Sequence, residues 1–170
     1  MKRVAVFGKP AGGKSTFSKR LSRATGISLH PLDLIEYYPD GSRVDAEVFR
    51  NKHKELLSQE EWIIDGFGTM PTFNARLAAA DTLFYIDLPY RVHYWWVIKR
   101  FLKSPFKAPE GWPDGSDVLN GTIASFKTLR KCPAFWNDEF VAQLYSNHPD
   151  KKIYIIKSTS ELDVTLYSES

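Results

Sequence analysis

Short apolar runs recur along the chain, separated by segments long enough to hold a helix. Polar residues, glycine or proline bound each run, a pattern that predicts short strands buried on both faces of a sheet. The runs cover residues 4–7, 27–30, 61–65, 82–88 and 151–156.

The intervening segments show helical spacing of apolar residues. In the first of them, Phe17, Leu21 and Ala24 stand at i, i+4 and i+7, and Gly26 ends the pattern. This alternation of strands with helices predicts an α/β fold in one domain over residues 1–170, with helices on both faces of a parallel sheet. We expect helices over residues 15–24, 45–59, 73–80, 91–103, 117–129, 134–146 and 160–167.

The first strand–helix junction has the sequence of a phosphate-binding (Walker A) loop. Residues Gly8–Ser15 read G-x-x-x-x-G-K-S, directly after one apolar run and before a helical segment. Glycines let backbone N–H groups approach a phosphate, and the helix points its positive end at the same place. A glycine-rich turn that only joins strand to helix is the alternative, but it leaves the lysine and serine without a role.

This loop predicts how a nucleoside triphosphate is held, and we take ATP as the donor. The Lys14 ammonium reaches the β- and γ-phosphates, while the Ser15 hydroxyl is a ligand for Mg²⁺. The residues expected to bind the nucleotide are Gly8, Pro10, Ala11, Gly12, Gly13, Lys14, Ser15, Thr16, Lys99 and Lys103.

Two aspartates follow predicted strands. Asp65 ends the run of 61–65, and Asp33 comes just after the run of 27–30. In a parallel sheet both lie at the carboxyl edge, where ligands bind. We expect Asp65 to hold Mg²⁺ together with Ser15. For Asp33, a solvated helix cap is an equally good interpretation of the position alone.

The predicted helix over 91–103 has a basic side and an apolar side. Trp95, Ile98 and Leu102 form the apolar side, and most rings of residues 93–96 are expected in the core. The basic side predicts a group that neutralises phosphates, although an ordinary solvated face is the alternative. A proline- and glycine-rich stretch at 104–116 favours a lid over residues 99–131. The basic side and its surroundings contain Lys99, Arg100, Lys103 and Lys107.

Overall composition adds a few limits. The net charge of +3 neither favours nor excludes nucleic acid as a partner. The one cysteine, Cys132, has no second cysteine to pair with, and the first strand starts at Val4. We therefore expect a cytoplasmic protein without a signal peptide. No apolar run approaches the length of a membrane span.

These motifs together resemble the adenylate-kinase-like family of DNA topology modulation proteins (FlaR-like), clearly as far as about residue 100. The resemblance rests on segments 8–16, 32–33 and 62–66, then on Arg76-Leu77 with Ala80-Asp81, Asp87-Leu88-Pro89 and Lys99-Arg100. It implies a three-layer P-loop NTPase fold like that of nucleoside monophosphate kinases, with strand order 2-3-1-4-5 and a lid. It also implies that Asp33 and Arg76 lie toward the phosphate acceptor, and Lys99, Arg100 and Lys103 toward the lid.

Our leading hypothesis is an ATP-dependent phosphotransferase of the nucleotide or small-molecule kinase type. Lys14, Asp33, Arg76 and Arg100 are the candidate catalytic residues, with ATP and Mg²⁺ as cofactors. The acceptor, a nucleotide or a hydroxyl compound, stays open. The alternative is a nucleotide-dependent regulatory or DNA-associated ATPase with slow hydrolysis.

Overall fold

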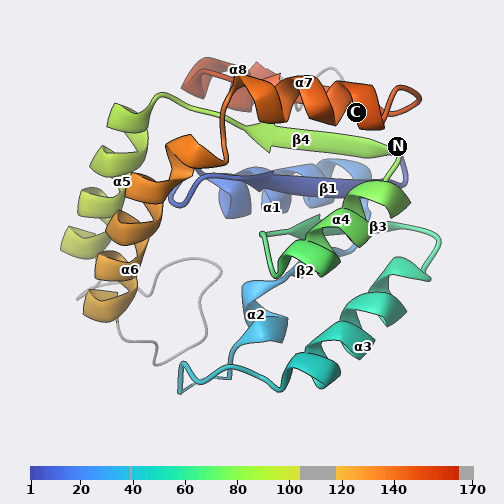
Figure 1. Ribbon diagram of the computed structural model, residues 1–170, viewed down its shortest axis with the longest axis horizontal. Helices are drawn as coiled ribbons and strands as arrows, with labels where there is room; N and C mark the ends of the chain where they lie inside the picture. Colours follow the sequence, from blue (N-terminus) through green and yellow to red (C-terminus); the bar gives the residue numbers. More distant parts are fainter. Residues whose placement is uncertain (39, 104–117, 165–170) are drawn as a thin grey trace.

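A sheet of five parallel strands forms the centre of the computed structural model, which describes residues 1–38, 40–103 and 118–164 (Figure 1). The strand order is β2-β3-β1-β4-β5, and every neighbouring pair is parallel. The predicted pairing and order are therefore confirmed. The strands are β1 (Arg3–Gly8), β2 (Leu29–Pro31), β3 (Trp62–Asp65), β4 (Thr82–Ile86) and β5 (Lys152–Ile156).

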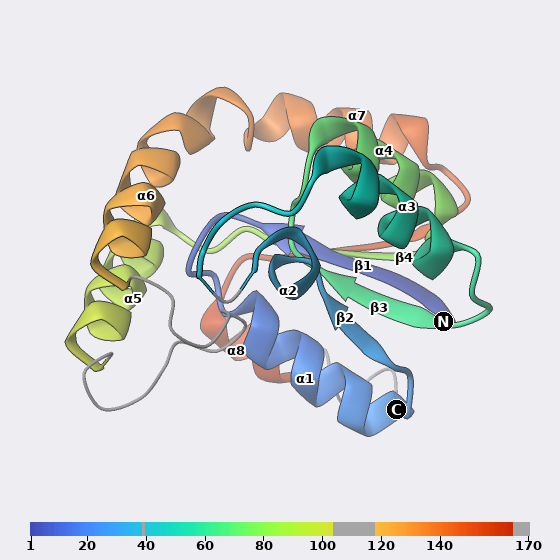
Figure 2. The ribbon, with the colours of Figure 1, turned by 90° about the horizontal axis from the view of Figure 1, so that it is seen from below.

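Helices cover both faces of this sheet. Figure 2 shows α1 and α8 along one face and α3, α4 and α7 along the other. The pair α5 and α6 lies beyond the carboxyl ends of the strands (Figure 1). The helices are α1 (Lys14–Thr25), α2 (Asp33–Glu36), α3 (Ala46–Leu57), α4 (Met70–Ala79), α5 (Tyr90–Lys103), α6 (Val118–Lys131), α7 (Asp138–Asn147) and α8 (Thr159–Val164), with a 3-10 turn η1 (Cys132–Ala134).

The core has two halves because successive strand residues point to opposite faces of the sheet. Under one face, Val6 packs with Phe17 of α1. Over the other face, the ring of Phe7 stacks with Tyr85 and Trp136, at centroid distances of 5.6 and 6.0 Å. Aromatic residues thus fill the half that lies under α4 and α7.

Some element boundaries differ from the predicted ones for local reasons. The sequence suggests that proline breaks the second strand, yet β2 includes Pro31, which lies opposite Asp65. An edge strand tolerates the missing N–H at its end. The helix expected from residue 134 begins at Asp138, because Asn137 caps it by accepting from the Phe140 N–H at 2.9 Å. Of the helix expected over 160–167, residues 165–167 lie outside the described part.

The aromatic stretch of α5 corrects one expectation. His93 and Val97 are buried, whereas Trp95 is 58% exposed and Leu102 is 63% exposed. The expected packing of most rings of residues 93–96 in the core is therefore wrong for Trp95. The reason is that α5 runs past the ends of the strands, where few of its sides meet the sheet (Figure 1).

The predicted lid falls partly on α5 and α6, and its residues 104–117, Lys107 included, lie outside the described ranges. Within the described ranges, no helix is both long enough and apolar enough to cross a membrane.

The aromatic half of the core predicts a large effect of truncation at Phe7. Phe7→Ala should lower the free energy of unfolding by about 3–5 kcal/mol, because neighbouring rings cannot close the cavity that it leaves. Denaturant unfolding measures this. Phe101→Ala in α5, where the side chain is 38% exposed, is the matched control and should cost far less. Equal losses in the two variants would contradict this description of the core.

Candidate active site

The phosphate-binding loop connects β1, in the middle of the sheet, with α1. Gly8 lies so close to β4 that a Cβ atom there would stand 2.3 Å from the Ile86 carbonyl oxygen. Gly13 has a left-handed φ of 77°, and its Cβ would meet the Trp96 ring at 2.8 Å. Neither position accepts a side chain. The two glycines therefore fix where the loop begins and where it becomes a helix.

Lys14 is the first residue of α1, and its ammonium group folds back onto the loop. Its Nζ donates a hydrogen bond to the carbonyl oxygen of Lys9, at 2.8 Å. Burial lowers the pKa of Lys14, while the charges of Asp65 and Asp33 oppose this effect. A phosphate would give this ammonium a stronger partner than a neutral carbonyl does.

Asp65 is the last residue of β3 and is 4% exposed. Burial raises its pKa to about 6, against the effects of the Lys14 charge and of a hydrogen bond with Ser15. Among the described residues its Oδ1 atom has no hydrogen-bond partner. The carboxylate is thus held next to Ser15 with one oxygen still unpaired.

This pair fits Mg²⁺, a hard cation that prefers oxygen ligands. No group of three or more His, Cys, Asp or Glu side chains in the described ranges could hold a metal. A magnesium ion at Ser15 and Asp65 would therefore take further oxygens from phosphates and water, as is usual for Mg²⁺ bound with a nucleotide.

Asp33 stands at the start of α2 and is exposed to solvent. The N–H of Leu32 donates to the Asp65 carbonyl oxygen at 2.8 Å, which holds the start of α2 beside the end of β3. Although the surface of Asp33 is open to solvent, the protein that surrounds it in the cavity raises its pKa through desolvation, while the charges of Lys14 and Arg100 lower it. The helix-cap alternative is not observed, since Leu32 is the N-cap and no side chain caps this helix.

Arg100 brings a positive charge from α5 to the same region. Its Nη2 donates to the Ser125 hydroxyl of α6 at 2.8 Å, which connects the two helices. Burial lowers the pKa of Arg100, and the charge of Asp33 raises it. Arg100 and Asp33 are therefore close enough to influence each other.

One cavity of about 1020 Å³ joins these groups at the carboxyl edge of the sheet. The structure thus brings together the loop, the expected metal ligands, Asp33 and Arg100. The residues that were predicted from the sequence as site residues and that line this cavity are Gly8, Pro10, Ala11, Gly12, Gly13, Lys14, Ser15, Thr16, Asp33, Asp65 and Arg100.

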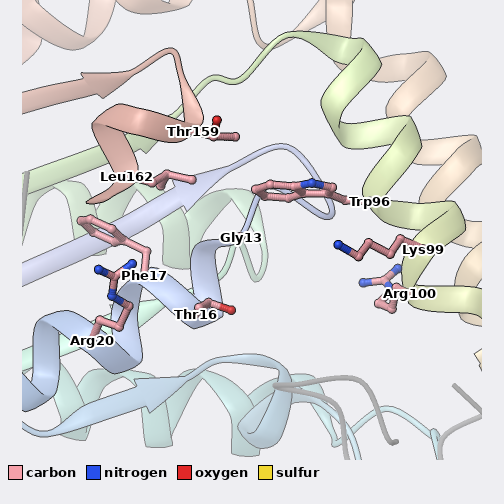
Figure 3. Close-up of a pocket in the computed structure, with 9 residues that line it drawn as sticks. All are labelled: Gly13, Thr16, Phe17, Arg20, Trp96, Lys99, Arg100, Thr159 and Leu162. Atoms are coloured by element: carbon pink, nitrogen blue, oxygen red, sulfur yellow. The ribbon is translucent and has the colours of Figure 1, made fainter. Parts of the chain in front are cut away.

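A second cavity of about 460 Å³ adjoins the end of the loop (Figure 3). In Figure 3 the Trp96 ring extends from α5 over Gly13, and Phe17 and Leu162 lie beyond it. Lys99 and Arg100 face the cavity from α5. This space has an aromatic and apolar wall next to a cationic one.

One predicted site residue lies elsewhere. Arg76 is fully buried and lines neither cavity, because its Nη2 donates to the carbonyl oxygens of Gly66 and Phe67 at 2.7 and 3.3 Å. It holds the loop after β3, so the implied acceptor clamp stays a prediction that requires this loop to open. Lys103 ends α5, and its side chain lies outside the described part.

The structure adds residues that sequence reasoning missed. Trp96 lines both cavities, and Ser125 and Trp136 line the larger one. For Trp96 a signal was present, since it precedes Lys99 by three positions and Arg100 by four, on one helix face. Ser125 and Trp136 had no comparable signal.

Neither a protein-family model nor a curated protein matches this chain. Among solved structures, it is similar to shikimate kinase from Acinetobacter baumannii in complex with shikimate, with a TM-score of 0.56 and 15% sequence identity. The match covers 99% of this chain and 90% of the other. Such a likeness shows the fold, so the predicted P-loop NTPase fold is confirmed. The resemblance to DNA topology modulation proteins stays a prediction.

The burial of Asp65 predicts a pH-dependent stability effect. A folded-state pKa of about 6, above the ordinary value of 3.8, means that ionisation of Asp65 opposes folding. The penalty is absent below about pH 4, grows between pH 4 and 6, and reaches at most about 3 kcal/mol above pH 6. Asp65→Asn should therefore stabilise the ligand-free protein at pH 7.5 and not at pH 4, as measured by urea unfolding.

Asp81→Asn is a control in which the expected change of stability at pH 7.5 has the opposite sign. Asp81 accepts from the N–H groups of Lys2 and Arg3 at 2.9 Å each, and its pKa is lowered. It stabilises the fold above its unfolded pKa, and this contribution is lost as pH falls through the folded pKa. Asparagine at position 81 should lower stability at pH 7.5. A loss of stability in Asp65→Asn at that pH would contradict the assignment of Asp65 as a buried carboxylate whose charge is only partly compensated.

Proposed function

We propose that this chain is an ATP-dependent phosphotransferase that transfers the γ-phosphate of ATP to a small-molecule acceptor. The observation that carries the proposal is the convergence of Lys14, Asp65 and Asp33, from three separate elements, on one cavity. Their charges are close enough to shift one another's pKa. Phosphoryl transfer needs mainly positioning and charge neutralisation, and this arrangement supplies both.

The donor side of the site consists of the phosphate-binding loop and α5. Backbone N–H groups of the loop and the Lys14 ammonium hold the β- and γ-phosphates. Arg100 lines both cavities and Lys99 lines the smaller one, and these two cations of α5 offset the negative charge of the triphosphate. Lys14 exchanges the Lys9 carbonyl for a phosphate oxygen when the nucleotide enters.

Ser15 and Asp65 are the residues that would hold Mg²⁺. The ion, when bound, reduces the negative charge on the phosphates and orients them. Asp65 is ionised above pH 6, so it has the charge state that a metal ligand requires at neutral pH.

Asp33 acts on an acceptor that bears a hydroxyl group. Its carboxylate takes the hydroxyl proton as the acceptor oxygen bonds to the γ-phosphorus, and the bond from that phosphorus to the β–γ bridging oxygen breaks. The products are the phosphorylated acceptor and ADP. The raised pKa of Asp33 makes its carboxylate a stronger base than an ordinary aspartate.

The smaller cavity takes the nucleoside of ATP. Its place next to Gly13 and Thr16 puts it at the end of the loop where the helix begins. The Trp96 ring offers a flat face on which a base can stack, and Phe17 and Leu162 supply apolar surface.

Transfer of label from γ-labelled ATP tests the function directly. Incubation with nucleosides, nucleotides, sugars and polynucleotide ends should label one class of acceptor. Lys14→Ala should lower the rate by about 100-fold or more, because one preorganised charge on the transferred group is lost. Lys52→Ala, an exposed lysine of α3, is the matched control and should leave the rate unchanged.

Undiminished transfer by Lys14→Ala would remove the central assignment. Label released only as free phosphate, with stimulation by DNA, would favour the regulatory ATPase instead.

If the base of ATP stacks on Trp96, loss of this ring should affect the affinity for ATP and the affinity for inorganic triphosphate differently. Trp96→Ala should weaken ATP binding by about 5- to 150-fold, the range expected for loss of one aromatic stack. The affinity for inorganic triphosphate should stay the same, as measured by calorimetric titration. Trp95→Ala, at a residue that lines neither cavity, should change neither affinity. Equal losses for ATP and triphosphate in Trp96→Ala would contradict a nucleoside site at this ring.

A further inference from the structure

Lys9 is a charged loop residue that the phosphate chemistry does not use. Its side chain is only 3% exposed and forms an ion pair with Asp87. Its Nζ also donates to the carbonyl oxygen of Leu88 at 3.2 Å and lies 4.5 Å from the centroid of the Tyr90 ring. A buried ammonium is costly unless it is paired, so these contacts hold Lys9 in one place.

The partner of Lys9 is itself fixed. Asp87 directly follows β4, and its N–H donates to the carbonyl oxygen of Ile156 in β5 at 2.8 Å. The hydroxyl of Tyr85 donates to Asp87 Oδ1 at 3.1 Å. The Lys9 ammonium therefore meets a carboxylate whose position is set by the sheet.

His93 makes a second connection between the loop and α5. Its side chain is fully buried, with Nδ1 2.8 Å from the carbonyl oxygen of Pro10 and Nε2 3.1 Å from that of Leu88. The ring also lies against the loop, since a Cβ atom at Gly12 would stand 2.9 Å from its Cε1 atom. Lys9 thus attaches the loop to the connection between β4 and α5, and His93 attaches Pro10 to α5 itself.

The next residue of the loop has an unfavourable backbone conformation. Ala11 has a φ of 51°, the one positive φ among the described residues other than glycine. Such a conformation costs about 1 kcal/mol or more in a residue with a Cβ atom, and it persists only where the surroundings hold it. The contacts of Lys9 and Pro10 immediately precede it.

We propose that Lys9, through Asp87, and His93 are positioning residues that pin the outer curve of the phosphate-binding loop to the end of β4 and the start of α5. The pins hold the loop in its phosphate-binding shape before any nucleotide arrives. A preorganised loop binds more tightly because less order has to be created on binding.

The same pins relate the loop to the walls of the two cavities. His93, Trp96 and Arg100 stand at i, i+3 and i+7 on α5, which places them along one side of the helix. Pinning the loop to His93 therefore sets the position of the loop relative to Trp96 and Arg100. This consequence for binding rests on the proposed function, whereas the pinning itself does not.

Amide hydrogen exchange of the ligand-free protein tests the pinning. In Lys9→Met, a peptide covering residues 8–16 should exchange about tenfold faster than in the wild type, because the loop opens more often. Asp87→Asn removes the same ion pair with little change of shape and should have a similar effect. The double variant should exchange no faster than the single variants, since the ion pair is already lost in each.

Lys151→Met is the matched control. The Lys151 ammonium also donates to backbone carbonyl oxygens, those of Leu77, Ala78 and Ala80 at the end of α4, far along the sheet from the loop. This variant should speed exchange near α4 and leave residues 8–16 unchanged. Unchanged exchange of the loop in folded Lys9→Met and Asp87→Asn, or an equal increase throughout the protein, would overturn the proposal.

Titration with Mg²⁺ and ATP separates this proposal from the proposed function. Lys9→Met should weaken binding about tenfold, and Lys151→Met should not change it. If the wild type binds no ATP, the proposed function fails while the exchange result still decides the pinning. Suppose that the wild type binds ATP, and that Lys9→Met exchanges faster over residues 8–16 but binds ATP with the wild-type affinity. Pinning then does not preorganise the site, and the proposal is overturned.

Discussion

Parallel pairing of β1 with both of its neighbours is the constraint on which the site depends. Val6 of β1 lies opposite Asp65 of β3, and Gly8 lies opposite Ile86 of β4. Because all three strands run the same way, the loop after β1 emerges between the ends of the other two. The β3 end supplies a carboxylate toward the loop, and the β4 end supplies the anchor at Asp87. No other position in the sheet would give the loop both neighbours.

Burial works against the ionised forms of the charged groups at this edge. Burial lowers the pKa of Lys14 and Arg100 and raises that of Asp65, so each group is shifted toward its neutral form. A triphosphate with Mg²⁺ brings charges of both signs that would pair with them. Under the proposed function, the site gives up part of the stability of the fold to keep charges ready for a ligand, a common property of functional sites.

The sequence was a good guide where a local pattern decides the structure. Apolar runs located the strands, the glycine spacing located the loop, and the strand-end position located Asp65. The strand order came from a family resemblance, because periodicity does not say which strands pair. Long-range contacts decided the remainder. Arg76 turned inward to the carbonyl groups after β3, and α5 extended past the sheet, which exposed Trp95. The pairing of Lys9 with Asp87 joins residues 78 positions apart, and no local pattern marks it.

A crystal structure with Mg²⁺ and a non-hydrolysable ATP analogue tests the central claim most directly. We expect the β- and γ-phosphates inside the loop with Lys14 on them, the ion between Ser15 and Asp65, and the base against Trp96. A nucleotide bound elsewhere, or a triphosphate in the loop with Asp65 turned away from the ion, would contradict this description of the site.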